Sequence, residues 1–205
     1  RPVAGEEAAQ RVFVPAGRAR GGLLVRPSVR AQESQRAVVE DPDLHAALVD
    51  LPLRSLLEAS GPARQKLLQG MLSNDVAARA PGQGCRAALL SAKGAVQALV
   101  RALVEKDVIL LETDRDRAAL VQQVLEYHRV AAPVRFAARD VSVLALLGPA
   151  GADVLRAWGV AEAPTEPEAP RGGPIGAMTG RPVRAGAPPG GGFVLHVPPD
   201  AAAAA

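Results

Sequence analysis

Residues 57–62 read LEASGP and residues 144–149 read LALLGP. Each stretch is a short, largely apolar run that ends in a Gly-Pro pair, and the two glycines, Gly61 and Gly148, lie 87 positions apart. Proline suits the first turn of a helix, since its missing N–H would have no partner there. A strand that enters a helix through the same turn therefore occurs twice, which predicts a tandem of two related halves. The alternative is that Gly-Pro makes a good helix entrance wherever it occurs.

The segments around these turns read as strands and helices in mixed order. Apolar residues at helical spacing predict one helix over 62–74 and another over 114–127. Between them, apolar runs separated by turns at 91–94 and 105–107 predict three consecutive antiparallel strands. The predicted fold class is α+β, with antiparallel sheets and packed helices. Further strands are expected at 48–51, 54–59, 134–136, 141–147 and 193–197, and a further helix at 150–158.

Composition excludes several functional classes. Of the 205 residues, 48% are hydrophobic and 22% are charged, which is typical of a globular protein. Only 2% are aromatic, and the net charge of +3 is not gathered into a stripe after residue 31, so no nucleic-acid partner is expected. No run of 18 apolar residues occurs, so no membrane span is expected. The lone cysteine, Cys85, favours a reducing compartment.

Four segments are expected along the chain. Residues 1–38 read as a disordered or targeting-like extension, and residues 41–160 as the folded N-terminal domain. Residues 161–189 are rich in proline, glycine and alanine and read as a linker. Residues 190–205 resume with a strand and end in Pro-Pro-Asp and five alanines, like the first turn of a helix. The chain is therefore expected to be truncated at its C-terminus, inside an incomplete second domain.

The N-terminal extension has the composition of an organelle targeting peptide. Residues 8–32 contain five arginines and no acidic residue. The stretch VRAQ at 29–32 is similar to a plastid processing site. An organelle location is expected, with the plastid favoured over the mitochondrion. The alternatives are a flexible extension of arbitrary composition and a bacterial cytoplasmic location.

Standard catalytic patterns do not occur in the sequence. Neither a G-x-G-x-x-G stretch after a strand nor a G-x-x-x-x-G-K-[ST] loop is present. The histidines, His45, His128 and His196, are too scattered to predict a metal site. Cys85 reads as a small buried hydrophobe. The residues by themselves predict an α+β domain and no particular chemistry.

Seven segments taken in order carry a family resemblance: 48–51, 60–62, 67–76 (LLQGMLSNDV), 81–85 (PGQGC), 88–94 (ALLSAKG), 140–149 and 191–199. Together they resemble the folate-binding superfamily of the glycine-cleavage T-protein (aminomethyltransferase) and the YgfZ-type proteins. The Ala-Lys-Gly turn at 92–94 is more similar to the YgfZ branch, and the PGQGC segment is similar to its plastid members. The resemblance implies three α+β domains around a central channel that takes the pterin, with two related halves.

By this resemblance the chain is a tetrahydrofolate-binding, YgfZ-like accessory protein that supports the maturation or repair of iron–sulfur enzymes. Its implied partners are folate and iron–sulfur client or assembly proteins. The T-protein branch has an acidic pair where this chain has Ala98 and Leu99, and an apolar pair cannot accept a proton. Whether the chain is an enzyme stays open, and no catalytic or metal residue is assigned. The alternatives are a folate-dependent one-carbon (aminomethyl-type) transferase with a different base, and a non-catalytic interaction module that kept the fold.

Four residues are candidates for contact with the folate cofactor. Arg54 lies where family members place a pocket-lining residue, and a guanidinium can hold a folate carboxylate in a bidentate pair. Lys93 lies at the turn between two strands and can meet an anion. Asn74 ends the first helix, and Tyr127 closes the second, where it can edge the channel. The alternatives are a solvated strand arginine, an exposed turn lysine, a helix cap or turn at Asn74, and helix-end packing at Tyr127.

Overall fold

The computed structural model describes residues 46–170, 173–175, 178–184 and 192–199. The expected extension at 1–38 and the expected helical turn at 200–205 lie outside these residues. In chain order the elements are β1 (Ala47–Asp50), β2 (Arg54–Ser60), α1 (Arg64–Met71), β3 (Gly84–Leu90), β4 (Val96–Val104), β5 (Val108–Asp114), α2 (Arg115–Arg129), β6 (Arg135–Arg139), β7 (Ser142–Leu147), α3 (Gly151–Ala157), β8 (Gly173–Ile175), β9 (Met178–Arg184) and β10 (Gly192–Val197).

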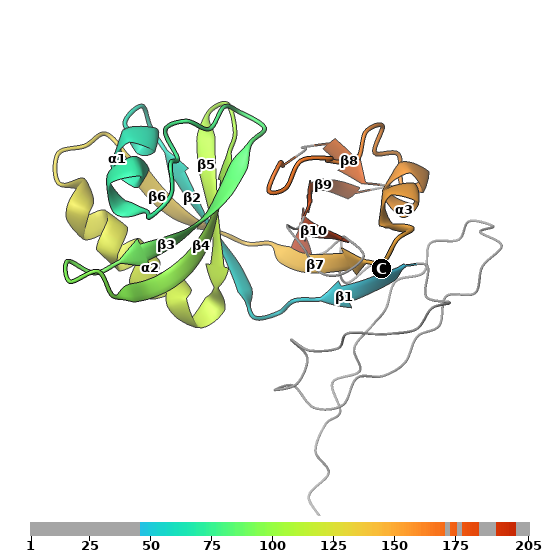
Figure 1. Ribbon diagram of the computed structural model, residues 1–205, viewed down its shortest axis with the longest axis horizontal. Helices are drawn as coiled ribbons and strands as arrows, with labels where there is room; N and C mark the ends of the chain where they lie inside the picture. Colours follow the sequence, from blue (N-terminus) through green and yellow to red (C-terminus); the bar gives the residue numbers. More distant parts are fainter. Residues whose placement is uncertain (1–45, 171–172, 176–177, 185–191, 200–205) are drawn as a thin grey trace, which may run out of the picture.

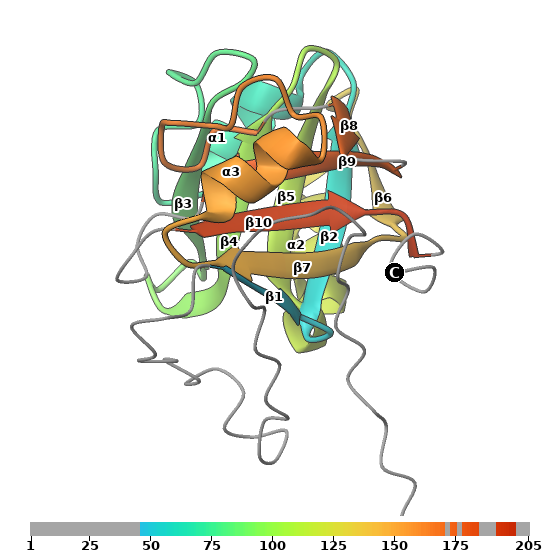
Figure 2. The same ribbon diagram turned by 90° about the vertical axis from the view of Figure 1, so that its right-hand side faces the viewer.

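The strands form two antiparallel sheets that lie face to face (Figure 1). The first sheet has the order β3-β4-β5-β2-β6, and α1 and α2 cover its outer face. The second sheet has the order β1-β7-β10-β9-β8, and α3 packs on its outer face. In Figure 2 the strands of one sheet run across those of the other. The predicted α+β class with antiparallel sheets and packed helices is confirmed.

The two sheets are built by two halves of the chain with one topology. The half that starts at β1 continues through β2, α1, β3, β4 and β5, and the half that starts at β6 continues through β7, α3, β8, β9 and β10. The strands β1 to β5 correspond in order to β6 to β10. With each strand replaced by its counterpart, the order β3-β4-β5-β2-β6 becomes β8-β9-β10-β7-β1, which is the second sheet read from its other edge. β1 pairs with β7 and β6 pairs with β2, so the first strand of each half completes the sheet of the other half. This exchange joins the halves through backbone hydrogen bonds.

The Gly-Pro turns have the same geometry in both halves. Gly61 has a φ of +106° and Gly148 a φ of +105°, in the region that favours glycine. In each half the carbonyl of this glycine accepts a hydrogen bond from the N–H three residues on, at 3.3 Å for Arg64 and 3.1 Å for Gly151. The predicted repeat therefore extends to the backbone conformation and the hydrogen bond of the two Gly-Pro turns.

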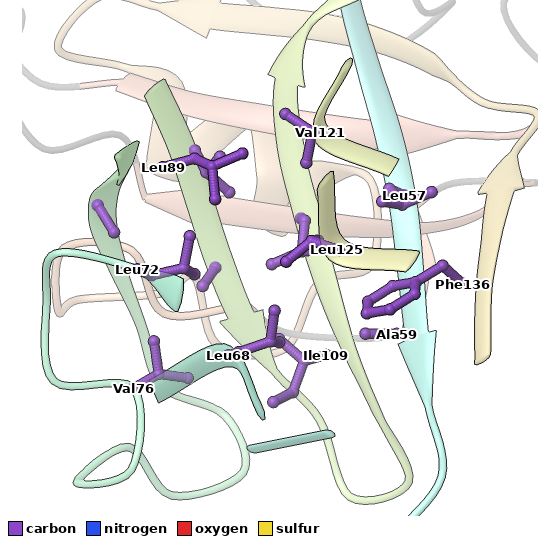
Figure 3. Close-up of a cluster of buried hydrophobic side chains, with 14 of the residues drawn as sticks. Leu57, Ala59, Leu68, Leu72, Val76, Leu89, Ile109, Val121, Leu125 and Phe136 are labelled. Atoms are coloured by element: carbon purple, nitrogen blue, oxygen red, sulfur yellow. The ribbon is translucent and has the colours of Figure 1, made fainter. Parts of the chain in front are cut away.

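The core of the first sheet lies between its outer face and the helices α1 and α2 (Figure 3). Leu68 on α1 and Leu125 on α2 are both fully buried against it. Alternation places every second strand residue in this core, as the strand period of two requires. On β4 the core-facing residues are Ala98, Val100, Ala102 and Val104. The intervening residues of β4 therefore face the second sheet.

Two segments differ from the sequence-based expectations. The helix expected over 62–74 ends at Met71, because Leu72 is extended and forms a bridge with Leu89. The Ser73 N–H then donates to the Ala88 carbonyl at 2.9 Å. The segment 161–189, read as a linker from its composition, contains β8 and β9. β9 pairs with β10, so a tertiary neighbour makes a strand from residues of low strand propensity.

No helix in the described part of the chain has the length and apolar character needed to cross a membrane.

Candidate functional site

The inner face of the first sheet, which is turned toward the second sheet, is apolar at one end and charged in the middle. Leu99 alternates with the core residues of β4 and lies on this inner face, where it is 63% exposed. Val96 is 62% and Leu90 is 37% exposed, and the two are register partners at the end of the β3–β4 hairpin. We call Leu90, Val96 and Leu99, together with the adjoining pair Arg54 and Asp114, the rim.

Arg54 and Asp114 are register partners on β2 and β5, next to Leu99 on β4. The Arg54 Nη1 donates to Asp114 Oδ1 at 2.5 Å, while its Nε and Nη2 donate to Glu112 Oε1 at 2.9 and 2.8 Å. Burial alone would lower the pKa of the Arg54 guanidinium, but the two carboxylates raise that pKa by more. The guanidinium therefore stays charged and is held by two of the chain's own carboxylates.

Glu112 lies behind the rim, and its side chain is only 2% exposed. Its Oε1 accepts from Arg54, and its Oε2 accepts from Arg101 Nη1 at 2.8 Å and contacts His196 Nε2 at 2.9 Å. Burial alone would raise the pKa of the Glu112 carboxyl, but the His196 hydrogen bond and the charges of Arg101 and Arg54 hold that pKa well below its ordinary value. Because the carboxylate is ionised, the His196 Nε2 carries the shared proton.

The contact between Glu112 and His196 joins equivalent positions of the two halves. Glu112 on β5 is the register partner of Leu56 on β2, and His196 on β10 is the register partner of Val143 on β7. Leu56 and Val143 lie 87 positions apart, as do the two Gly-Pro glycines. The internal repeat therefore places two residues from equivalent positions of the two halves, Glu112 and His196, in contact where the two sheets meet.

This arrangement can bind and orient a ligand, but it offers no free base. Glu112 is buried and fully engaged by cationic and hydrogen-bond donors, so it cannot exchange a proton with a substrate at neutral pH. Asp114 is tied to Arg54. Of the apolar pair at 98 and 99, Ala98 is 4% exposed in the helix-side core and Leu99 faces the rim. Position 99 is therefore the one of the two that a ligand can reach.

The four candidates from the sequence lie in separate places. Asn74 is bound within the chain, because its Nδ2 donates to the Arg86 carbonyl at 2.8 Å and its Oδ1 accepts from the Asp75 N–H at 2.8 Å. Lys93 is exposed in the β3–β4 turn, beyond the rim. Tyr127 is 79% exposed near the end of α2, with its ring 5.1 Å from that of His128.

Among these candidates, Arg54 belongs to the rim, and Lys93 lies on the hairpin that carries Val96. Tyr127 lies at the other end of the sheet from Arg54, since α2 starts beside Leu53 and runs about 22 Å away from it. The role of the four residues in folate binding stays a prediction.

Sequence reasoning missed Glu112, Arg101 and His196. Arg101 and Glu112 are directly opposite in register, and this pairing follows from the turn at 105–107 that the sequence did indicate. His196 had no such signal, because it approaches Glu112 from the other half of the chain. Among the described residues, no group of three or more His, Cys, Asp or Glu side chains is placed to hold a metal ion.

Comparison with solved structures identifies the fold. The glycine cleavage system aminomethyltransferase T from Bartonella henselae matches with a TM-score of 0.70 and 23% sequence identity, over 78% of this chain and 44% of that chain. The heterotetrameric sarcosine oxidase from Corynebacterium sp. U-96, solved in complex with pyrrole 2-carboxylate, matches with a TM-score of 0.51 and 18% identity, over 74% and 75% of the two chains. No family model and no curated protein sequence matches the chain. The chain therefore has the aminomethyltransferase-like fold, and it spans less than half the length of that aminomethyltransferase.

Proposed function

We propose that this chain is a folate-binding accessory protein that holds a reduced folate at the rim without transferring an aminomethyl group. The observation that carries the proposal is Leu99, which lies exposed on the inner face at a position where the sequence resemblance implies an acidic residue. The aminomethyltransferase-like fold supports a folate as the ligand, and the leucine argues against proton transfer to it.

The residues of the rim fit a flat heterocycle that carries polar edges. Leu90, Val96 and Leu99 offer an exposed apolar surface to the faces of a pterin ring. Asp114, whose side chain is 43% exposed, would accept hydrogen bonds from ring N–H and amino groups. Arg54 would orient Asp114 through their ion pair. When bound, the reduced folate would supply a one-carbon carrier.

The accessory role, as opposed to a transferase role, rests on the state of the nearby acids. A general base needs a pKa near the working pH and a free route to the substrate. Glu112 has a strongly lowered pKa and is buried, and Asp114 is paired with Arg54. Support of iron–sulfur enzymes is proposed from the resemblance of the Ala-Lys-Gly turn at 92–94, and an organelle, preferably plastid, location from the arginine-rich segment at 8–32.

The decisive experiment is a calorimetric titration with tetrahydrofolate, paired with an aminomethyl-transfer assay. Saturable binding without transfer is the expected result. Leu99→Ala is expected to weaken binding severalfold, because it removes apolar surface that the ring would contact. The matched control is Val130→Ala at the end of α2, because Val130 is 86% exposed and remote from the rim. The absence of saturable binding to the folded protein would reject the proposal and favour an interaction module, in which a partner protein covers the same exposed leucines and valine.

The cellular part of the proposal has separate tests. A reporter fused to residues 1–38 is expected to enter plastids, and retention in the cytosol would contradict the targeting role. Loss of the protein from cells is expected to lower the activity of iron–sulfur enzymes more than that of other enzymes. Equal losses would contradict the accessory role.

A further inference from the structure

Two arginines of the first sheet face each other across a pair of strands. Arg86 on β3 and Arg101 on β4 are register partners on the inner face. Like charges placed directly opposite each other destabilise a sheet. The Arg101 side chain is only 8% exposed, whereas that of Arg86 is 57% exposed. This pair therefore requires an anion, and solvent can reach the place for it from the side of Arg86.

The anion in the structure is the carboxylate of Glu168, which comes from the other half of the chain. Its Oε1 accepts from Arg86 Nε at 2.7 Å, and its Oε2 forms an ion pair with Arg101 Nε. The two carboxylate oxygens of Glu168 are therefore divided between the two guanidinium groups.

Glu168 is held in place by a constrained segment, residues 166–170, which we call the strap. The φ of Glu168 is +61°, in the left-handed region, which is unfavourable for a residue with a side chain. The Glu168 N–H donates to the Arg184 carbonyl at 2.9 Å. The backbone carbonyl of Glu168 lies so close to β3 that a Cβ added to Gly84 would be 2.2 Å from the Glu168 carbonyl oxygen. The strap is therefore seated on the sheet at some cost in backbone conformation.

We propose that Arg86 and Arg101 form a binding site for an external carboxylate, and that Glu168 occupies this site as an internal competitor. An incoming carboxylate takes the position between the two guanidinium groups, and the Glu168 side chain moves into solvent. No covalent bond changes, and the charge inside the site stays the same. A planar, singly charged group fits best, because Glu112 already binds Arg101 Nη1 and repels an anion of higher charge.

This site contains no residue of the rim, although Glu112 binds both Arg101 and Arg54, and it is tested without folate. The variant Glu168→Gly vacates the site and removes the backbone strain, since glycine accepts a positive φ. Thermal unfolding is compared in sodium acetate and in sodium chloride at equal ionic strength. Acetate is expected to raise the unfolding temperature of the variant by several degrees more than chloride, and to do so much less in the wild-type protein. The matched control is Glu166→Gly, which removes an exposed acid from the same strap and is expected to show no preference for acetate.

A second measurement uses the wild-type protein and does not depend on the folding of any variant. The Nε–H NMR signals of Arg86 and Arg101 are followed during titration with acetate and with chloride. Saturable shifts of both signals in acetate alone support the site. Equal responses to the two salts, or no response of either arginine, overturn the proposal, as does a Glu168→Gly variant that chloride stabilises as well as acetate.

Discussion

Replacing Glu112 by glutamine is expected to destabilise the protein more than any exposed charge substitution. The substitution keeps the shape of the side chain but removes the charge that four hydrogen-bond donors share. Two of these donors come from Arg54, and the others are Arg101 Nη1 and His196 Nε2. An amide oxygen can replace one carboxylate oxygen, but the amide nitrogen cannot accept a hydrogen bond.

The size of the effect follows from the burial of these donors. Arg54 is 26% exposed and can regain water, whereas Arg101 is 8% exposed and His196 is fully buried. Each buried donor that loses its acceptor costs about 1–3 kcal/mol. Two such donors give a loss of about 2–6 kcal/mol, a range that contains the loss of about 3–5 kcal/mol for removing one partner of a buried ion pair.

The free energy of unfolding of the wild-type protein and of Glu112→Gln is measured by urea denaturation at neutral pH. The control is Asp153→Asn, because Asp153 is 73% exposed beside Arg156 and its loss is expected to cost less than about 1 kcal/mol. A loss below about 1 kcal/mol for Glu112→Gln would refute the reasoning.

The same pair of variants has an expected pH dependence. Because the folded pKa of Glu112 is lowered, its contribution is fully present above the ordinary value near 4.5 and is lost as the pH falls below it. The Glu112→Gln variant is therefore expected to lose less of its remaining stability between neutral and acid pH than the control does.

Two further predictions concern the first turn and the lone thiol. Gly61→Ala is expected to destabilise the protein by more than about 2 kcal/mol, because its φ is +106° and the new Cβ would lie 2.2 Å from the Pro133 carbonyl oxygen. Gly82→Ala, with a φ of +87° and no atom within 4 Å of the new Cβ, is expected to cost only about 1–2 kcal/mol, and equal losses in urea would contradict this reasoning. Burial raises the pKa of the Cys85 thiol, so it is expected to react with a disulfide reagent at pH 8 more slowly than an exposed thiol, and faster as the pH is raised. A rate at pH 8 equal to that of a small free thiol would contradict the burial of this side chain.

Local patterns predicted much of the fold correctly. The Gly-Pro turns, the hairpin around residues 91–94 and the apolar stripe of α2 each depend on residues within one or two turns of chain. Their geometry is set by backbone sterics and by side-chain period, which neighbouring residues control. Apart from β8 and β9, the strands and the helix entrances were therefore predictable, and so was the repeat of the strand–turn–helix unit.

Elements that depend on distant partners were not predictable in the same way. α1 ends early because Leu72 joins Leu89 on β3, and β9 forms because β10 lies beside it. The charged cluster has the same origin. Arg54 and Glu112 are 58 positions apart, and Glu112 and His196 are 84 positions apart.

The sequence by itself determined the α+β class, the repeated strand–turn–helix unit and the apolar character of positions 98 and 99. Tertiary structure alone decided that Leu99 faces the exposed rim while Ala98 lies in the core, and that Glu112 is an ionised anchor instead of a base. It also decided that Glu168 reaches across to Arg86 and Arg101. The physical reason is that burial and charge pairing are properties of a position in space, and the exchange of first strands between the halves sets those positions.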